Sequence, residues 1–248
     1  MSRFDRAIGL ARSMAIYHAI PGRQRRLRRF YAEFVRAGDL MFDVGAHVGN
    51  HARSAAALGC RVVAVEPQPD FARLLRMLFA GSSRIVVVEA AVGEASGRGL
   101  LSISERTPTV TSVAADWRDE RAREPGFAHV RWNRRIDIDT LTLDGLIERF
   151  GAPAFVKIDV EGSEPAVLAG LTRAVPAVSF EYLPGAFAAV EACVARLGTL
   201  GPYVFNWSPG ESYRFGSSSW LDGSALVEAL QAAGAAQRSG DVYARLVR

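Results

Sequence analysis

The sequence predicts an α/β fold built on a mostly parallel sheet. From Leu40 onwards, short apolar runs of strand length alternate with segments whose apolar residues recur at helical spacing. This alternation is typical of parallel strands joined by right-handed helical crossovers. Two of the apolar runs end in turns that hold glycine and carboxylates, around Asp43 and Asp159. A chain of 248 residues fits one large domain of this class.

Residues 1–37 precede the sheet and are expected to form an N-terminal helical cap. Apolar residues recur there at helical spacing, and Pro21-Gly22 breaks the run before a second helix over about 23–36. The α/β domain is then expected over residues 38–248.

Apolar runs rich in β-branched residues predict the strands, and amphipathic stretches predict the helices. The expected strands cover residues 40–44, 61–66, 84–90, 155–159, 177–182, 203–207, 212–215 and 242–247. The expected helices cover residues 49–58, 70–80, 144–150, 160–171 and 185–197, with a last one capped near Asp222.

Residues 94–138 interrupt this alternation. They are rich in Ser, Thr and Arg, and they include Trp117 and Trp132, before an extended pattern resumes over 136–143. A long irregular stretch inside a compact domain is more often functional than idle, so we expect an insertion that shapes a substrate pocket. A simple surface excursion is the alternative.

Composition points to a soluble globular protein. Hydrophobic residues make up 49% of the chain and charged residues 23%. The sequence has no run of 18 uncharged apolar residues that would predict a membrane span. Asp5, Arg6 and Arg12 interrupt the amino terminus before any run long enough for a signal peptide. We therefore expect a cytoplasmic protein.

The net charge of +4 does not indicate a nucleic-acid partner. The basic residues concentrate in Arg23–Arg29 and are not arranged around an aromatic stacking surface. The run is interpreted first as a solvated helix face, and contact with an anionic membrane surface or an acidic glycan is the less favoured alternative. Cys60 and Cys193 lack the spacing of a metal or disulfide site and are expected to be buried.

The turn after the first strand predicts a nucleotide site. Gly45 and Gly49 carry no Cβ, so the backbone can turn sharply and a ligand can approach the main chain. Glu66 falls where the second parallel strand should end. An acidic side chain there suits the two hydroxyl donors of a ribose.

The glycine spacing favours S-adenosylmethionine over NAD. A dinucleotide site has the pattern G-x-G-x-x-G, whereas this turn reads Asp43-x-Gly45-x-x-x-Gly49. The leading carboxylate would repel a pyrophosphate but attract a cationic ligand that bears an amino acid. Taken alone, such a turn can also exist merely to pack an α/β unit.

A second motif, Lys157-Ile158-Asp159-Val160-Glu161-Gly162-Ser163-Glu164, crowds three carboxylates and one ammonium at a strand end. Ligands bind at this edge of open α/β sheets. Neighbouring carboxylates raise one another's proton affinity, which favours a general base or a cation site. Alternatively, Glu161 and Glu164 only occupy the first turn of a helix, where negative charge suits the dipole.

Together, the two motifs resemble those of the FkbM family of S-adenosylmethionine-dependent methyltransferases. The resemblance also includes Val65-Glu66-Pro67 and Ala90-Ala91-Val92-Gly93, and it covers roughly residues 40–183. It implies a class I methyltransferase (Rossmann-like), doubly wound, seven-stranded sheet whose last strand is antiparallel. It also implies O-methylation of a hydroxyl, often on sugars or polyketide-type products.

The resemblance assigns roles to individual positions. The cofactor-binding residues it implies are Asp43, Gly45, Ala46, Gly49, Asn50, Glu66, Pro67, Ala91 and Val92. Asp159, Glu161 and Glu164 match the second signature of the family. Two features depart from the family pattern: His47 stands where asparagine is usual, and residues 76–79 lack the usual asparagines.

Methyl transfer to a hydroxyl requires alignment and a base. We expect a carboxylate to act as that base, with Asp159, Glu161 and Glu181 as the candidates. His47 and His51 are the less favoured choices, because both could simply satisfy helix contacts. No metal is assigned, although metal assistance through the same acids is a second hypothesis.

The sequence is also compatible with two other classes of protein. One is a non-catalytic binding module that keeps the cofactor fold, and the other is an NAD-dependent oxidoreductase. The acceptor is expected to be a small molecule or glycan hydroxyl. Surface glycans, a lipid-linked saccharide and a secondary metabolite all remain candidates, and the sequence does not indicate an oligomeric state.

Overall fold

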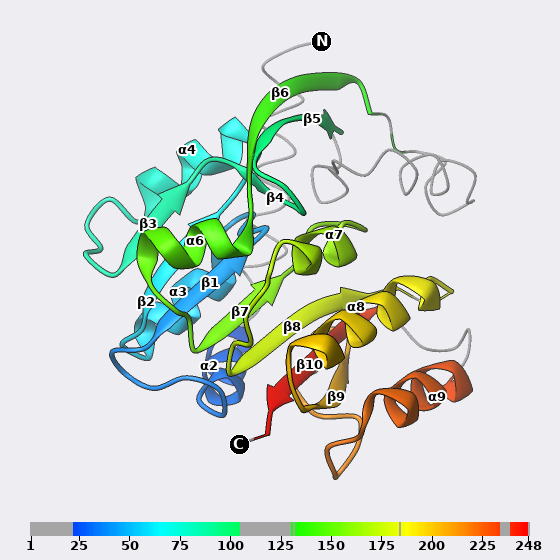
Figure 1. Cartoon of the computed structure of the whole chain (residues 1–248). Helices are drawn as coiled ribbons and strands as arrows, with labels where there is room; N and C mark the ends of the chain where they lie inside the picture. The colour runs from blue at the N-terminus through cyan, green and yellow to red at the C-terminus, as the bar shows by residue number, and fades with distance from the viewer. Residues whose placement is uncertain (1–21, 105–129, 131, 184, 234–238, 248) are drawn as a thin grey trace.

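A computed structural model of the chain describes residues 22–104, 130, 132–183, 185–233 and 239–247 (Figure 1). Its centre is a seven-stranded sheet in the order β3-β2-β1-β7-β8-β10-β9. The strands are β1 Leu40–Val44, β2 Arg61–Val65, β3 Ile85–Val88, β7 Phe155–Ile158, β8 Ala177–Tyr182, β9 Tyr203–Pro209 and β10 Gly240–Leu246. The last strand, β10, is antiparallel to both of its neighbours, β8 and β9. The predicted doubly wound, mostly parallel sheet is confirmed.

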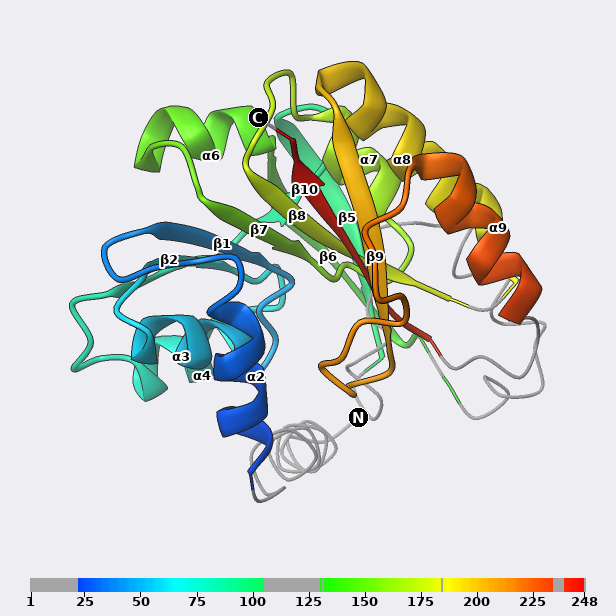
Figure 2. The ribbon, with the colours of Figure 1, turned by 90° about the horizontal axis from the view of Figure 1, so that it is seen from below.

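Helices cover both faces of this sheet (Figure 2). On one face lie α2 Arg23–Tyr31, α3 Asn50–Ala57 and α4 Pro69–Leu78. On the other lie α6 Leu143–Phe150, α7 Glu164–Ala169, α8 Phe187–Leu200 and α9 Gly223–Ala233. Each face has its own hydrophobic core: Leu27, Phe30 and Leu75 belong to the first, and Leu146 and Leu197 to the second. Burial of these two layers fixes the sheet between them.

A second, three-stranded sheet stands beside the first and shows that the ends of the 94–138 stretch are not irregular as expected. Its strands are β4 Ala91–Val92, β5 Gly97–Ile103 and β6 Arg134–Leu141, in the order β4-β6-β5. Residues 97–103 and 134–138, near the two ends of the stretch expected to be irregular, therefore pair as antiparallel strands, and Leu101 and Ile103 are buried there in a small apolar cluster with Ile138. Trp117 lies outside the described residues.

Other boundaries differ from the prediction for local reasons. The helix expected over 160–171 begins only at Glu164, because Glu161 and Gly162 have positive φ and form a turn. No strand forms at 212–215, where Tyr213 has φ 51°. The helix expected over 23–36 ends at Tyr31, and the first half of the predicted cap lies outside the described residues.

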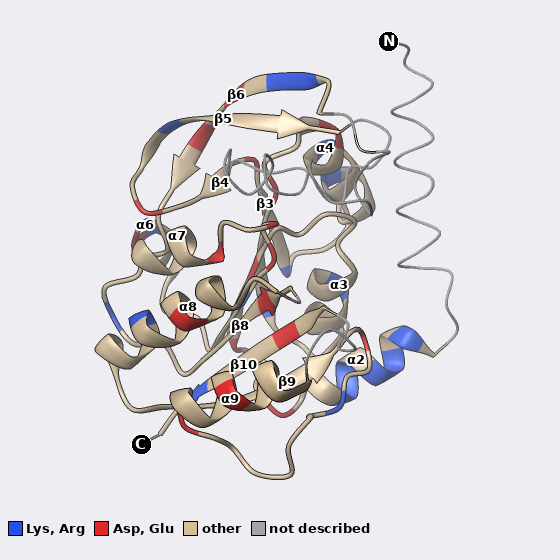
Figure 3. Ribbon diagram, turned by 90° about the vertical axis from the view of Figure 1, so that its right-hand side faces the viewer, with Lys and Arg blue, Asp and Glu red and all other residues tan. Residues whose placement is uncertain are grey.

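The arginine run lies on α2 (Figure 3). Arg25, Arg26, Arg28 and Arg29 are exposed, as expected of a solvated face. Arg23 differs, since it is buried and forms an ion pair with Glu211. Both cysteines are free and buried, as predicted. No helix in the described part of the chain is long and apolar enough to cross a membrane.

Candidate functional site

A cavity of about 240 Å³ opens at the carboxyl ends of the parallel strands, and we call it the sheet-edge cavity. It brings together two segments that are far apart in the sequence, the turn after β1 and the turn after β7. The sequence-predicted residues that line it are Gly45, Glu66, Pro67, Ala91, Val92, Asp159, Glu161 and Glu181, with His47 and His51. The two motifs therefore form one site.

Four predicted cofactor residues do not line the cavity. Asp43, Ala46 and Asn50 are buried. The Asp43 carboxylate accepts a hydrogen bond from the Ala52 amide (2.9 Å), which holds the start of α3. At Gly49 a Cβ would lie 2.7 Å from the Phe79 ring, so this glycine allows α4 to pack closely. These residues support the turn after β1 without lining the cavity.

Gly45 joins the two motifs. Its φ is +82°, and a Cβ at this position would lie 1.7 Å from the Asp159 carbonyl oxygen. The Asp159 amide also donates to the Val44 carbonyl (3.0 Å). The backbones of the two turns thus touch directly, which only glycine permits.

Glu66 is a buried carboxylate at the end of β2, 3% exposed. It accepts hydrogen bonds from the amides of His47 and Gln68, both at 2.8 Å. Each carboxylate oxygen keeps a further lone pair, so the group can still accept from two ribose hydroxyls. The cavity wall beside it is apolar and includes Pro67, Ala91 and Leu101, which suits an adenine ring.

His47 departs from the family pattern without disturbing the turn. Its backbone φ is 48°, in the left-handed region where asparagine and histidine are both tolerated. Its ring packs on Phe71 with ring centroids 4.4 Å apart. The substitution therefore preserves the backbone shape and the amide bond to Glu66.

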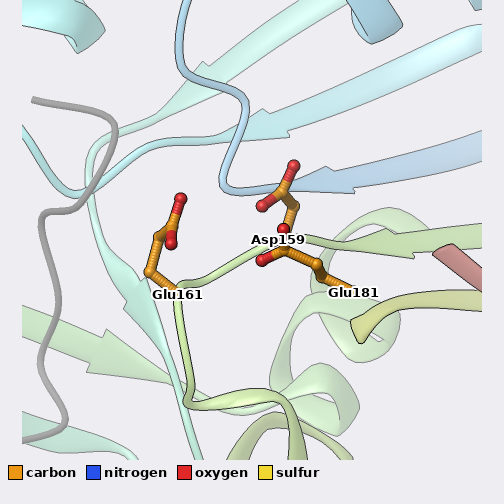
Figure 4. A group of neighbouring side chains, drawn as sticks. All are labelled: Asp159, Glu161 and Glu181. Carbon is orange, nitrogen blue, oxygen red and sulfur yellow. The ribbon is translucent and has the colours of Figure 1, made fainter. Parts of the chain in front are cut away.

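The second motif places carboxylates on the opposite wall (Figure 4). Asp159 and Glu161 come from the turn after β7, and Glu181 comes from β8. One oxygen of each of these three carboxylates lies within 4.8 Å of the others, a spacing that could also hold a metal ion. Lys157 is buried beneath them, with its Nζ 3.0 Å from Asp159 Oδ2 and 3.6 Å from Asp241 Oδ1.

Burial and mutual repulsion shift the pKa values of this cluster. Burial, with Asp159 and Glu164 nearby, raises the pKa of Glu161 well above its usual value. Burial and the charges of Glu161 and Asp159 do the same for the pKa of Glu181. Burial opposes the charge of Lys157, but the surrounding carboxylates outweigh it and raise the Lys157 pKa. The site can thus hold protons on its glutamates and a permanent charge on its lysine.

Glu164 has a different role from its neighbours in the motif. Its buried carboxylate accepts a hydrogen bond from the Val160 amide (3.1 Å), and the Gly162 amide is a further partner. It does not line the cavity. Glu164 holds the turn that presents Asp159 and Glu161, so it is a positioning residue.

Sequence reasoning missed the wall contributed by the carboxyl-terminal part of the chain. Glu211 and Tyr213 follow β9, and Ser239 and Asp241 lie at the start of β10. The available signal was Asp241, a charged residue before an apolar run. The expected strand over 242–247 leaves Asp241 just outside it, whereas β10 begins at Gly240.

The buried acids predict that stability falls as pH rises. Burial raises the pKa of Asp43 to about 6, and those of Glu66 and Glu164 to about 7. The folded state therefore binds protons more tightly than the unfolded state. The stability from these groups is complete below pH about 4 and is lost as pH rises through about 6 to 7.

For the cofactor-free protein, we expect the thermal midpoint to fall by about 5–10 °C between pH 5 and pH 8. Circular dichroism melts would measure it, and Glu66→Gln should reduce the fall because it removes one of the shifted acids. A midpoint that rises over this range would contradict the prediction.

Comparison with known proteins places the chain among methyltransferases. A family model described as the methyltransferase FkbM domain matches residues 43–198. The hexuronic acid methyltransferase AglP of Haloferax volcanii is 32% identical over 157 residues, covering 61% of this chain. The chain spans 58% of the length of that relative.

Solved structures of similar arrangement include a precorrin-6y C5,15-methyltransferase from Geobacter metallireducens. It shares 10% identity and a TM-score of 0.49, with 90% of this chain and 87% of that one covered. A TehB-like SAM-dependent methyltransferase from Corynebacterium glutamicum has 10% identity and a TM-score of 0.48, with 96% and 94% covered.

Proposed function

Since this chain belongs to the methyltransferase FkbM domain family, we propose that it transfers a methyl group from S-adenosylmethionine to a hydroxyl of a sugar or glycan. A hydroxyl of a secondary metabolite is the alternative acceptor. The observation that carries the proposal is the sheet-edge cavity, in which Glu66 faces the same space as Asp159, Glu161 and Glu181. Membership of this family argues against the hypothesis of an NAD-dependent oxidoreductase.

The cavity fits the cofactor on structural grounds. Gly45 lets the turns after β1 and β7 meet at one edge of the cavity, Glu66 offers a buried acceptor for a ribose, and Ala91, Val92 and Leu101 form an apolar wall. When bound, S-adenosylmethionine supplies the methyl group on a sulfonium. Glu66 and the turn after β1 would hold it, and the carboxylates opposite would favour its positive charge.

The chain's own residues then have to align the acceptor and take one proton. Hydroxyl groups of a sugar are donors, so the carboxylates of Asp159, Glu161 and Glu181 can orient them. The bound cofactor would supply the methyl group, and its sulfur would keep the electron pair of the carbon–sulfur bond. Of these three acids, one that is ionised takes the hydroxyl proton.

The relative's name supports a saccharide acceptor but raises a second possibility. A hexuronic acid carries both hydroxyls and a carboxyl group, and either can receive a methyl group. Described residues lining the cavity include six acids, Glu66, Asp159, Glu161, Glu181, Glu211 and Asp241. These would disfavour an acceptor's carboxylate, so a hydroxyl is the better candidate.

The test uses the purified full chain and methyl-labelled S-adenosylmethionine with neutral sugars, nucleotide sugars, hexuronates and polyketide alcohols. Label that survives mild alkali is a methyl ether and supports a hydroxyl acceptor. Label released by alkali is a methyl ester and would overturn the proposed acceptor. Cofactor binding without transfer to any compound would instead favour a non-catalytic module.

A further inference from the structure

His51 is held in the sheet-edge cavity by the helical cap. It lies in the first turn of α3 and lines the cavity together with Gly45, Lys157 and Asp241. The hydroxyl of Tyr31, from α2, lies 2.5 Å from His51 Nδ1. Tyr31 is 1% exposed, and its ring packs edge-on against Phe155 of β7. The pair therefore has little freedom to rearrange.

The direction of this hydrogen bond follows from the burial of Tyr31. Within the described residues, the Tyr31 hydroxyl has no acceptor other than His51 Nδ1. A buried hydroxyl whose proton found no acceptor would cost about 1–3 kcal/mol. Tyr31 therefore donates and Nδ1 accepts, which leaves the proton of the neutral imidazole on Nε2.

Burial and the neighbouring positive charges keep the His51 ring neutral. Burial, followed by the positive charges of Lys157 and Arg23, lowers the His51 pKa well below its usual value. Burial raises the Tyr31 pKa, so this hydroxyl keeps its proton. With Nδ1 already occupied and Nε2 protonated, His51 is a hydrogen-bond donor and is unsuited to act as the base.

The part of the cavity around His51 differs from the carboxylate wall, because it offers a hydrogen-bond donor. The two charges that act most on the ring are both cations, although each already has a partner: Lys157 pairs with Asp159 and Asp241, and Arg23 pairs with Glu211. Asp43 already accepts the Ala52 amide at the start of α3. Within the described residues, His51 Nε2–H is thus a donor that no hydrogen bond uses.

We propose that His51 Nε2–H binds the α-carboxylate of S-adenosylmethionine and that Tyr31 positions it. This inference rests on the proposed function. The cofactor carries ribose hydroxyls, which suit Glu66, and an ammonium, which suits the carboxylates after β7. Its α-carboxylate is its one anionic group and needs a donor outside the acidic wall. The helical cap thereby completes the cofactor site.

The test compares S-adenosylmethionine with its decarboxylated analogue, which lacks only that carboxylate. Calorimetry on the full chain should show wild type binding S-adenosylmethionine about 10- to 100-fold more tightly than the analogue. In His51→Phe the two affinities should become nearly equal, whereas His51→Gln, which retains an N–H donor, should restore part of the preference. Tyr31→Phe should reduce the preference. It keeps the aromatic ring but removes the hydroxyl that donates to Nδ1, so the His51 proton is no longer held on Nε2.

Glu66→Gln is the matched control, because it should weaken both ligands by the same factor and leave their ratio unchanged. A wild-type preference that persists in His51→Phe would overturn the inference, as would equal affinities in wild type. If His51→Phe does not fold, the ratio of the two affinities in Tyr31→Phe and His51→Gln tests the inference instead. Failure of wild type to bind either ligand would instead overturn the proposed function.

Discussion

Replacing Gly45 by alanine is expected to weaken cofactor binding strongly and to destabilise the fold. The new Cβ would lie 1.7 Å from the Asp159 carbonyl oxygen, a backbone atom that cannot rotate away. Left-handed backbone adds about 1–2 kcal/mol for a residue other than glycine, and overpacking adds about 1–3 kcal/mol. We expect the free energy of unfolding to drop by about 2–5 kcal/mol and cofactor affinity to drop on the order of 100-fold.

Gly38→Ala is the matched control for this variant. Gly38 has φ +90°, close to the +82° of Gly45, but a Cβ there would meet nothing within 4 Å. It should therefore show only the backbone cost and retain cofactor binding. Chemical denaturation and calorimetry measure both quantities. If Gly45→Ala resembled Gly38→Ala in both, the contact between the two motifs would not be what positions the site.

The sequence was sufficient to predict the sheet and most of the site because both follow local patterns. Apolar runs such as Leu40–Val44 and Ala177–Tyr182 are strands with the predicted bounds, since each is buried on both faces of the sheet. Parallel strands must place Asp159 and Glu66 at one edge, so the two motifs were expected to meet. The identity of the cofactor, S-adenosylmethionine, was predicted from the glycine spacing and from the resemblance to the family.

Other parts depend on contacts that no local pattern records. Residues 97–103 form a strand because they pair with 134–141, across a long stretch of intervening sequence. Glu164 matches the second family signature together with Asp159 and Glu161, but its carboxylate faces the amides of its own turn. The roles of Tyr31 and Asp241 arise from tertiary packing of α2 and β10 on the cavity, which spacing alone does not predict.

Among the acids of the cavity wall, Asp159 is the one whose replacement we expect to lower the rate of methyl transfer most. Asp159 lies at the end of β7, lines the cavity and has Lys157 Nζ 3.0 Å from its Oδ2. Its backbone carbonyl lies against Gly45, and its carboxylate lies near those of Glu161 and Glu181. In the proposed mechanism we therefore expect Asp159 to influence both the cofactor and the acceptor.

Asp159→Asn is expected to lower kcat by about 10²- to 10⁴-fold, the range typical of a lost acid–base group. The amide keeps the size of the side chain but cannot take a proton or balance the buried Lys157, so stability should also fall by about 1–3 kcal/mol. Single-turnover assays with a methyl-labelled donor measure the chemical step, and calorimetry measures cofactor affinity separately.

Asp139→Asn is the matched control, because Asp139 is exposed and pairs only with the exposed Arg98 in the described residues. Its turnover should equal that of wild type. Glu161→Gln and Glu181→Gln complete the set, since the acid that takes the proton should show the larger loss in kcat with little change in cofactor affinity. Full turnover with unchanged cofactor affinity in both Asp159→Asn and Glu161→Gln would rule out these carboxylates as the base.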